Sequence, residues 1–310
     1  MNTYDIITLT INPALDKSTH FKGLVAEQKI RCSEPRFDAG GGGINVSKAI
    51  SRLGGTSLAI FTSGGPLGEM LEELIFKESI PFQAVPIKAW TRESFVAVDE
   101  NTNSQYRFGF TGGEISDEEE QAFLNAVTSL KSKFIVASGS LNEGLASDFY
   151  QKVAQIAQQS GAKLIVDTSG EALEKVLETG AYLIKPNVGE LAKLVGVERL
   201  EMEEVNEAAK QIIAKGGAEI VVVSLGPQGA VLVTKDTYEF VPAPNVAKKS
   251  TVGAGDSMVG GMVWALSQNK NLKEVIRWGV ACGSAATMNE GTQLFKGADA
   301  QRLFDWLKDK

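Results

Sequence analysis

Short runs rich in β-branched residues alternate with longer amphipathic segments along most of this 310-residue chain. The strand candidates are residues 6–11, 57–62, 134–137, 163–167, 182–185, 220–225 and 230–234. The helix candidates include residues 44–53, 68–78, 118–129, 145–160 and 205–215. Because parallel strands need long crossover connections, this alternation predicts an α/β fold with a largely parallel central sheet flanked by helices. Such sheets bind ligands beyond the carboxyl ends of their strands.

Two stretches interrupt the alternation. Residues 17–37, and residues 94–98 with 105–110, have the pattern of paired strands without an intervening helix. They predict a small antiparallel β-sheet, a lid formed by about residues 17–37 and 92–110, inserted in a single domain of residues 1–310. Because one face of such a sheet is exposed, we expect it to form a homodimer contact.

Charge and hydropathy exclude several classes of partner. The net charge is −7 and no Lys/Arg cluster is present, which argues against a nucleic-acid partner. No apolar run approaches the roughly 18 residues of a membrane span, and the N-terminus lacks the pattern of a signal peptide. Cys32 and Cys282 lie outside any metal-ligand spacing, which is typical of reduced thiols in a cytoplasmic protein.

The strongest motif is Thr-Val-Gly-Ala-Gly-Asp-Ser at residues 251–257, followed by an apolar helical pattern. Small residues at a helix N-terminus leave backbone N–H groups free to bind an anion. Asp256 stands in the first turn, where a carboxylate can accept a proton from a hydroxyl group. Phosphoryl transfer needs these two parts together. The alternative is an ordinary helix with an aspartate in its first turn.

A second motif is the run of four glycines at residues 40–43, which precedes a helix. Glycines permit close approach of the backbone to a ligand, although a mobile loop fits the same residues. The run is not a Walker A loop, and it is a poor dinucleotide fingerprint because a lid-like segment precedes it. Asn45, in the first turn of the helix, is placed to bond sugar hydroxyls.

Two weaker motifs follow predicted strands. Asn187 and Glu190 lie three residues apart in Lys-Pro-Asn-Val-Gly-Glu, and an amide oxygen with a carboxylate suits Mg²⁺ held largely through water. Alternatively, Glu190 only stabilises a helix dipole. The glycine-rich turn at residues 226–229 can admit adenine or ribose, or is only a turn. Residues 138–140, and Asp16 with Asn12, are weak signals by themselves.

Taken in this order, these segments resemble the ribokinase-like sugar kinase family over essentially the whole chain, and most closely its branch of 6-phosphofructokinases. The matching text lies at residues 40–50, 90–92, 105–108, 166–173, 224–230 and 250–259. The resemblance implies transfer of the γ-phosphoryl group of ATP to the 1-hydroxyl of fructose 6-phosphate, which yields fructose 1,6-bisphosphate and ADP. It also implies Mg²⁺, with K⁺ as a candidate second cation.

The resemblance also implies a role for individual residues. The catalytic set is Asp256 as general base with Gly253, Ala254 and Gly255 as the anion hole. The sugar-binding set is Asp16, Gly41, Gly42, Asn45, Arg92 and Ser140. The ATP-binding set is Lys29, Lys185, Asn187, Ser224, Gly226 and Gly229, and the Mg²⁺-associated pair is Asn187 and Glu190. The monovalent-cation set is Ser250, Val252, Ala286, Asn289 and Gly291.

Comparison within the family bears on the substrate. Related 1-phosphofructokinases and tagatose-6-phosphate kinases usually read Gly-Gly-Lys-Gly where this chain has four glycines. The 6-phosphofructokinase branch instead has a lid lysine before an Arg-Cys pair, as Lys29 precedes Arg31 and Cys32 here. We therefore expect Lys29 to reach the phosphates over the active site and Arg92 to hold the 6-phosphate. Departures from the family pattern are Asn142, Glu143, Gly189 and Gln293.

Four other functions are weighed against this one. Tagatose-6-phosphate kinase and 1-phosphofructokinase share the phosphoryl-transfer chemistry. A catalytically silent sugar- or nucleotide-binding protein is the alternative from a different class, and an intact Asp256 argues against it. An NAD-binding oxidoreductase is disfavoured because the glycine run is wrongly placed.

Overall fold

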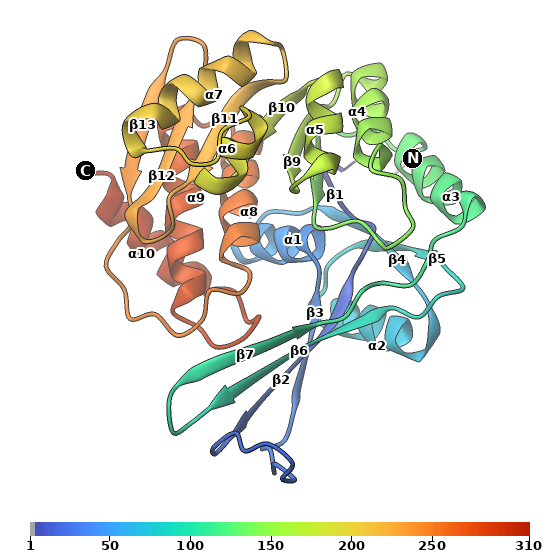
Figure 1. Cartoon of the computed structure of the whole chain (residues 1–310). Coiled ribbons are helices and arrows are strands. Elements are labelled where there is room, and N and C mark those ends of the chain that lie inside the picture. The colour runs from blue at the N-terminus through green and yellow to red at the C-terminus, as the bar shows by residue number, and fades with distance from the viewer. Residues whose placement is uncertain (1–3) are drawn as a thin grey trace.

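A computed structural model describes residues 4–310, which are built around a nine-stranded sheet of order β13-β12-β11-β10-β9-β8-β1-β4-β5 (Figure 1). Its strands are β1 (Ile6–Thr10), β4 (Leu58–Ser63), β5 (Phe82–Pro86), β8 (Phe134–Ser138), β9 (Lys163–Asp167), β10 (Ala181–Ile184), β11 (Ala218–Ser224), β12 (Gly229–Val233) and β13 (Tyr238–Pro242). From β5 to β11 all neighbouring strands are parallel, whereas β12 and β13 form an antiparallel edge. The largely parallel sheet predicted from the sequence is therefore confirmed.

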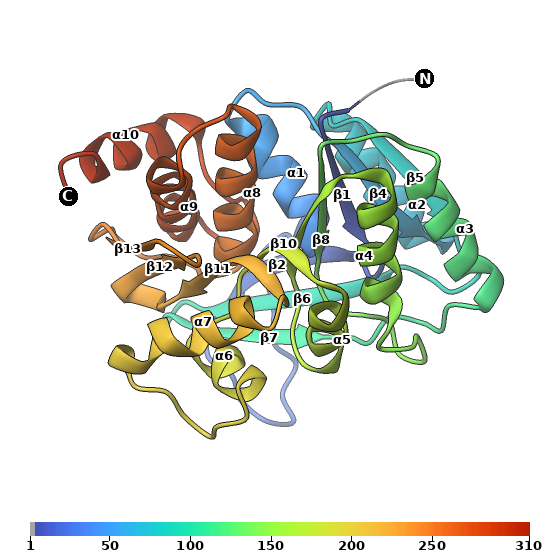
Figure 2. The same ribbon diagram turned by 90° about the horizontal axis from the view of Figure 1, so that it is seen from above.

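Helices cover both faces of this sheet (Figure 2). One face carries α1 (Gly42–Arg52), α2 (Gly65–Lys77), α8 (Ala254–Ser267), α9 (Leu272–Thr287) and α10 (Gly297–Leu307). The other carries α3 (Asp117–Thr128), α4 (Phe149–Ser160), α5 (Glu171–Thr179), α6 (Val188–Leu194) and α7 (Val205–Ala214). Two short 3-10 helices are η1 (Met202–Glu204) and η2 (Gly226–Gln228). None of the helices within residues 4–310 is long and apolar enough to cross a membrane.

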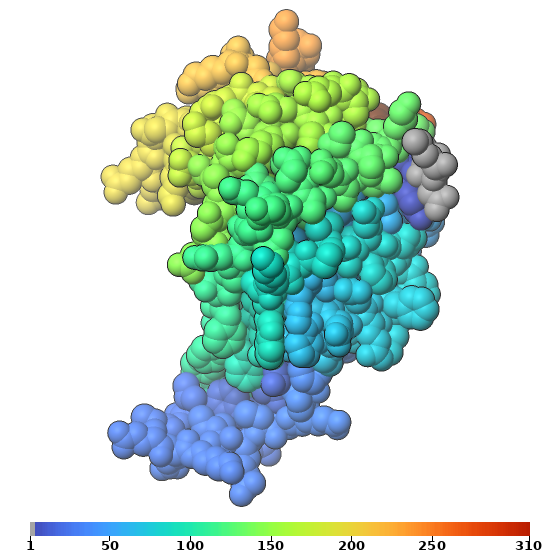
Figure 3. Space-filling view, turned by 90° about the vertical axis from the view of Figure 1, so that its right-hand side faces the viewer, coloured from blue at the N-terminus to red at the C-terminus, as the bar shows by residue number. Residues whose placement is uncertain are grey.

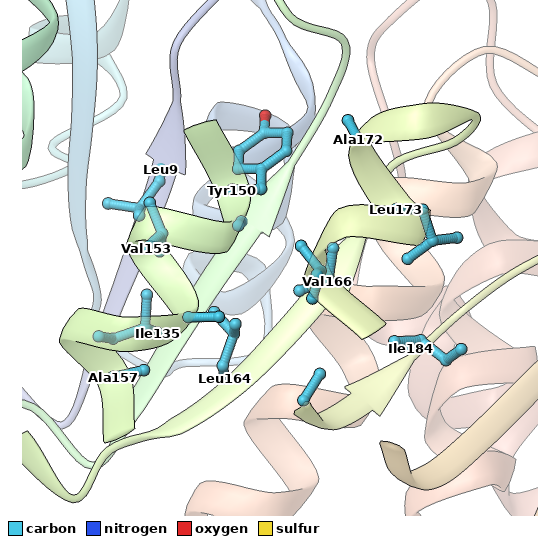
Figure 4. Packing of buried hydrophobic residues seen from close by; sticks show 14 of the residues in the cluster. Leu9, Ile135, Tyr150, Val153, Ala157, Leu164, Val166, Ala172, Leu173 and Ile184 are labelled. Carbon is cyan, nitrogen blue, oxygen red and sulfur yellow. The ribbon is translucent and has the colours of Figure 1, made fainter. Parts of the chain in front are cut away.

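The central strands are buried on both faces, which explains their nearly continuous apolar sequences. In Figure 4, Tyr150 and Val153 of α4 pack toward Leu9 and Ile135 of the neighbouring strands β1 and β8. The side chain of Ile6 points to the opposite face, into the cluster formed with α1, α8, α9 and α10. Burial of both faces fixes the register of these strands, because a slip of one residue would exchange the two apolar sets.

The strand order places a crevice between β1 and β8. The chain runs from β1 outward to β4 and β5, then returns to the other side of β1 and runs from β8 to β11. Neighbouring loops therefore leave the sheet in opposite directions at this switch point, which is where open α/β sheets bind ligands. Asn12, which follows β1, and Ser140, which follows β8, lie at this crevice.

A separate four-stranded sheet projects from the body of the molecule (Figures 1 and 3). It has the order β3-β2-β6-β7, with β2 (Ala14–Phe21), β3 (Arg36–Gly40), β6 (Arg92–Asp99) and β7 (Ser104–Gly109). We call it the small sheet. Its outer pairs are antiparallel as predicted, but β2 and β6 are parallel. The reason is that β3, α1, β4, α2 and β5 separate them along the chain, which is a crossover long enough for parallel pairing.

Candidate active site

Asp256 lies in the first turn of α8, at the carboxyl edge of the large sheet. The helix begins at Ala254, after Gly253 with a φ of 72°, a left-handed conformation that glycine adopts without strain. The Nδ2 atom of Asn45, on α1, donates a hydrogen bond of 2.9 Å to Oδ2 of Asp256. Two helices that lie far apart in the sequence thus hold the carboxylate between them.

The surroundings of Asp256 raise its pKa to about 6. Burial is the main cause, and the nearby Asp167 carboxylate adds to it, whereas Asn45, Lys185 and Ser138 act in the opposite direction. A carboxylate of this kind is ionised at neutral pH and yet is basic enough to accept a proton from a hydroxyl group. This combination suits a general base.

Lys185, which follows β10, places a buried positive charge beside the same helix end. Its Nζ lies 3.1 Å from Oδ1 of Asp167. Burial alone would lower the pKa of Lys185, but the charge and hydrogen bond of Asp167 raise it, so the ammonium stays protonated. A Cβ atom added to Gly255 would lie 3.4 Å from this Nζ. The ammonium and the free N–H groups of α8 therefore lie together, an arrangement that suits an anion.

Asn187 and Glu190 form a capping box at the start of α6, which begins at Val188. Oδ1 of Asn187 accepts from the backbone N–H of Glu190, and Oε2 of Glu190 accepts from that of Asn187, both at 2.9 Å. Glu190 therefore also has the role that was its alternative interpretation, which is to stabilise the N-terminus of a helix. The cap also fixes both side chains beside Ser224, at the end of β11, whose N–H bonds the carbonyl oxygen of Pro186.

The glycine run at residues 40–43 packs tightly against the protein itself. Gly41 has a φ of 115°. A Cβ atom on Gly42 would overlap Oγ of Ser138 and lie only 2.9 Å from the backbone N of Gly139. The sequence predicted that these glycines let the backbone approach a ligand. In the structure, Gly42 approaches the end of β8. It seats the N-terminus of α1, and with it Asn45, against the crevice.

Two of the predicted sugar-binding side chains, those of Arg92 and Ser140, meet at Asn12. Arg92, at the start of β6, donates from Nε to Oδ1 of Asn12 at 2.9 Å, and Nδ2 of Asn12 lies 3.4 Å from Oγ of Ser140. Asp16 is buried nearby, and burial raises its pKa to about 6 although Lys48 and Arg92 oppose the shift. The structure thus brings together a guanidinium, a carboxylate and a hydroxyl group at one side of the crevice between β1 and β8.

Lys29 is not at the site of its own chain. It lies in the loop of residues 22–35 that joins β2 to β3, at the far end of the small sheet from α8 (Figure 1). The predicted lid strands stop short of this region, in which an isolated bridge joins Phe21 and Cys32. Because β2 and β3 extend beyond the body, they carry the loop away from Asp256.

The predicted nucleotide turn follows β11, and the predicted cation set lies before α8 and at the end of α9. The turn of Gly226 and Gly229 follows β11 and is closed by the N–H of Leu225, which donates to the carbonyl oxygen of Gly229 at 2.9 Å. The N–H of Ser250 donates to the carbonyl oxygen of Thr287 at 3.2 Å, which joins the segment before α8 to the end of α9. The remaining members of the cation set are Val252, Ala286, Asn289 and Gly291, which belong to these two segments.

The sequence reading gave no role to Asp167 and Ser138. Asp167 pairs with Lys185, and both Asp167 and Ser138 shift the pKa of Asp256. A signal for both was available, because each is the last residue of a strand, β9 and β8, near the switch point. No cluster of three or more His, Cys, Asp or Glu side chains that would hold a metal ion occurs within residues 4–310.

Comparisons with known proteins agree with this geometry. The family model for pfkB family carbohydrate kinases matches residues 4–297. The ATP-dependent 6-phosphofructokinase isozyme 2 of Escherichia coli (strain K12) is 43% identical over 304 residues, which cover 97% of this chain and 98% of that protein. The 1-phosphofructokinase of Bacillus subtilis (strain 168) is 34% identical over 293 residues, which cover 94% of this chain and 95% of that protein.

A solved structure extends the likeness to three dimensions. The structure of phosphofructokinase-2 from Escherichia coli in complex with substrates and products superposes with a TM-score of 0.94 at 42% identity, and the match covers 98% of this chain and 99% of that one. The family resemblance inferred from the sequence is therefore confirmed. The chain belongs to the pfkB family of carbohydrate kinases.

Proposed function

We propose that this chain is an ATP-dependent 6-phosphofructokinase, which phosphorylates the 1-hydroxyl of fructose 6-phosphate and forms fructose 1,6-bisphosphate and ADP. The observation that carries the proposal is the Asp256 carboxylate, held by Asn45 at the N-terminus of α8 with the Lys185 ammonium beside that helix end. The 6-phosphofructokinase relative, at 43% identity, supports the choice of sugar over the 1-phosphofructokinase at 34%.

The reaction follows from these positions. Arg92 binds the 6-phosphate, because a guanidinium can bond two phosphate oxygens at once. Asp256 accepts the proton of the 1-hydroxyl while the sugar oxygen forms a bond to the γ-phosphorus, and the bond from that phosphorus to the β-phosphate oxygen breaks to release ADP. The N–H groups of α8 and the Lys185 ammonium offset the negative charge of the transferring group.

Mg²⁺ fits the donors beside this site. The Asn187 amide oxygen, the Glu190 carboxylate and the Asp167 carboxylate are hard oxygen ligands suited to a magnesium ion that keeps several waters. When bound with ATP, the ion neutralises phosphate charge. Carbonyl oxygens of the segments around Ser250 and Asn289 suit a monovalent cation such as K⁺, and one solved relative is described in complex with potassium.

The geometry of the glycine run supports the same branch of the family. A lysine in place of Gly42 would need a Cβ atom where Oγ of Ser138 and the backbone of Gly139 already lie. The cation that related 1-phosphofructokinases and tagatose-6-phosphate kinases carry in this loop therefore has no room here unless β8 shifts.

A sugar panel tests the substrate. With Mg-ATP and purified protein, we expect the highest kcat/KM for fructose 6-phosphate, ahead of tagatose 6-phosphate and fructose 1-phosphate, in a coupled assay of ADP release. A preference for another sugar would reassign the substrate. Release of no ADP with any sugar would favour the silent binding protein.

The Asp256→Asn variant tests the base. We expect kcat to fall by about 10²–10⁴-fold while the affinity for fructose 6-phosphate, measured by calorimetry, stays nearly unchanged. Because the raised pKa of about 6 leaves Asp256 protonated at lower pH, the kcat of the unmodified enzyme should fall as the pH drops through about 6. Asp16 has a similar pKa and should affect KM instead.

The matched control is Asp236→Asn, which changes an exposed aspartate in the turn between β12 and β13. It should leave both kcat and its pH profile unchanged. Near-normal turnover in Asp256→Asn would remove this residue from the mechanism.

For Arg92→Ala we expect the KM for fructose 6-phosphate to rise about 10- to 100-fold, because a charged hydrogen bond to the 6-phosphate is lost. The KM for ATP should change little. Arg302→Ala is the control, since Arg302 is exposed on α10 and pairs with Asp299 at 3.2 Å, outside the small sheet. An unchanged sugar KM would place the 6-phosphate elsewhere.

We also propose that two copies of the chain pair through the small sheet. Phe95 of β6 and Phe108 of β7 stack with ring centroids 5.8 Å apart, and Phe108 and Phe110 remain 50% and 56% exposed. Exposed aromatic residues on an edge strand of a sheet are typical of an interface. A phosphofructokinase-2 relative is described as a tetramer in an inhibited form, which supports association of copies.

The Phe108→Asp variant should shift the mass in sedimentation velocity from dimer to monomer, because a charge would be buried in an apolar contact. Phe76→Asp is the control, as Phe76 is 73% exposed on α2, outside the small sheet. A monomeric mass of the unmodified protein at micromolar concentration would contradict the proposal.

A further inference from the structure

Arg52, at the end of α1, bonds to a segment that is remote in the sequence. Its guanidinium donates to the carbonyl oxygens of Gln293 and Phe295, the latter at 2.8 Å. Its other amino group lies 3.5 Å from the Glu78 carboxylate. The side chain is partly buried, with 28% of its surface exposed, so these bonds compete little with water. One planar cation thus binds the carbonyl oxygens of the residues before and after Leu294.

Leu294 itself is held in an unusual conformation. Its φ is 57°, in the left-handed region that bulky side chains rarely adopt, and the residue is 1% exposed. Such a backbone persists only where the surroundings over-determine it, and it occurs preferentially at functional sites. Here the two bonds from Arg52 supply that constraint, because the carbonyls that flank Leu294 cannot rotate without breaking them.

The side chain of Leu294 packs directly against the anion hole. A Cβ atom added to Gly253 would lie only 2.5 Å from Cδ2 of Leu294. Gly253 is the residue from which α8 starts, two positions before Gly255 and three before Asp256. Arg52 therefore reaches the N-terminal turn of α8 through one intermediate residue, Leu294.

We propose that Arg52 is a positioning residue for phosphoryl transfer, which fixes the N-terminal turn of α8 through Leu294. The inference rests on the proposed kinase function. In this proposal α1 positions the Asp256 carboxylate from both of its ends, directly through Asn45 and indirectly through Arg52. The N–H groups of α8 stabilise charge that develops in the transition state, whereas Arg92 and Asp16 bind the sugar from the small sheet. Loosening α8 should therefore lower kcat and spare the sugar KM.

The Arg52→Met variant tests this division. We expect kcat with Mg-ATP and fructose 6-phosphate to fall about 10- to 100-fold, as small misplacements of catalytic groups do, with the sugar KM within about twofold of the unmodified enzyme. The matched control is Arg277→Met. Arg277 donates to the carbonyl oxygen of Lys310, away from α8, so its loss should leave kcat unchanged.

Two further measurements separate positioning from stability. Arg52→Ala should regain part of its kcat when guanidinium is added far below denaturing concentrations, and an equal concentration of sodium chloride should not restore it. Leu294→Gly keeps Arg52 and suits the left-handed backbone, but it removes the contact with Gly253. It should show the same fall in kcat, and the effects of Arg52→Met and Leu294→Gly should be less than additive.

An unchanged kcat in Arg52→Met, or additive effects of the two substitutions, would overturn the inference. If Arg52→Met fails to fold, Leu294→Gly decides by the same criterion of lowered kcat at unchanged sugar KM. Should the unmodified enzyme release no ADP in the sugar panel, the proposed function fails instead, and the two failures are thereby distinguished.

Discussion

Two carboxylates, Asp167 and Asp256, share a single buried ammonium, that of Lys185, at the carboxyl edge of the sheet. This balance matters for the proposed function, because ATP and a sugar phosphate are anions and the net charge of the chain is −7. Lys185 and the N-terminus of α8 supply the positive charge and the N–H groups that offset the acidic surroundings at this point. Burial, to which the second carboxylate adds, raises the pKa of Asp256 above that of a carboxylate in water, which suits the proposed acceptance of a hydroxyl proton.

The sequence predicted those parts of the structure that local patterns determine. The strand at residues 163–167 was predicted with the bounds it has, and Asp256 was placed in the first turn of a helix. Both depend on neighbouring residues alone: a β-branched run between breaks, and small residues before an apolar helical pattern. The carboxyl edge as the location of the site followed from the parallel order of the strands.

Contacts between distant segments could not be predicted in this way. Nothing in the glycine run shows that Gly42 packs on Ser138, and nothing near Arg52 points to the carbonyl groups on either side of Leu294. The parallel pairing of β2 with β6 and the distance of Lys29 from α8 likewise depend on where the small sheet leaves the body. These features arise from packing, and packing is a property of the whole chain.

The residues proposed to bind the two substrates belong to separate parts of the fold. Arg92 and Asp16 lie at the base of the small sheet, whereas Lys185 and Asp256 belong to the body. Helix α1 joins these parts, since its first residues follow β3 of the small sheet and its side chains Asn45 and Arg52 bond the body. The position of the small sheet is thereby coupled through α1 to the position of the carboxylate. Coupling of this kind needs a rigid connecting element with bonds at both ends, and α1 is such an element.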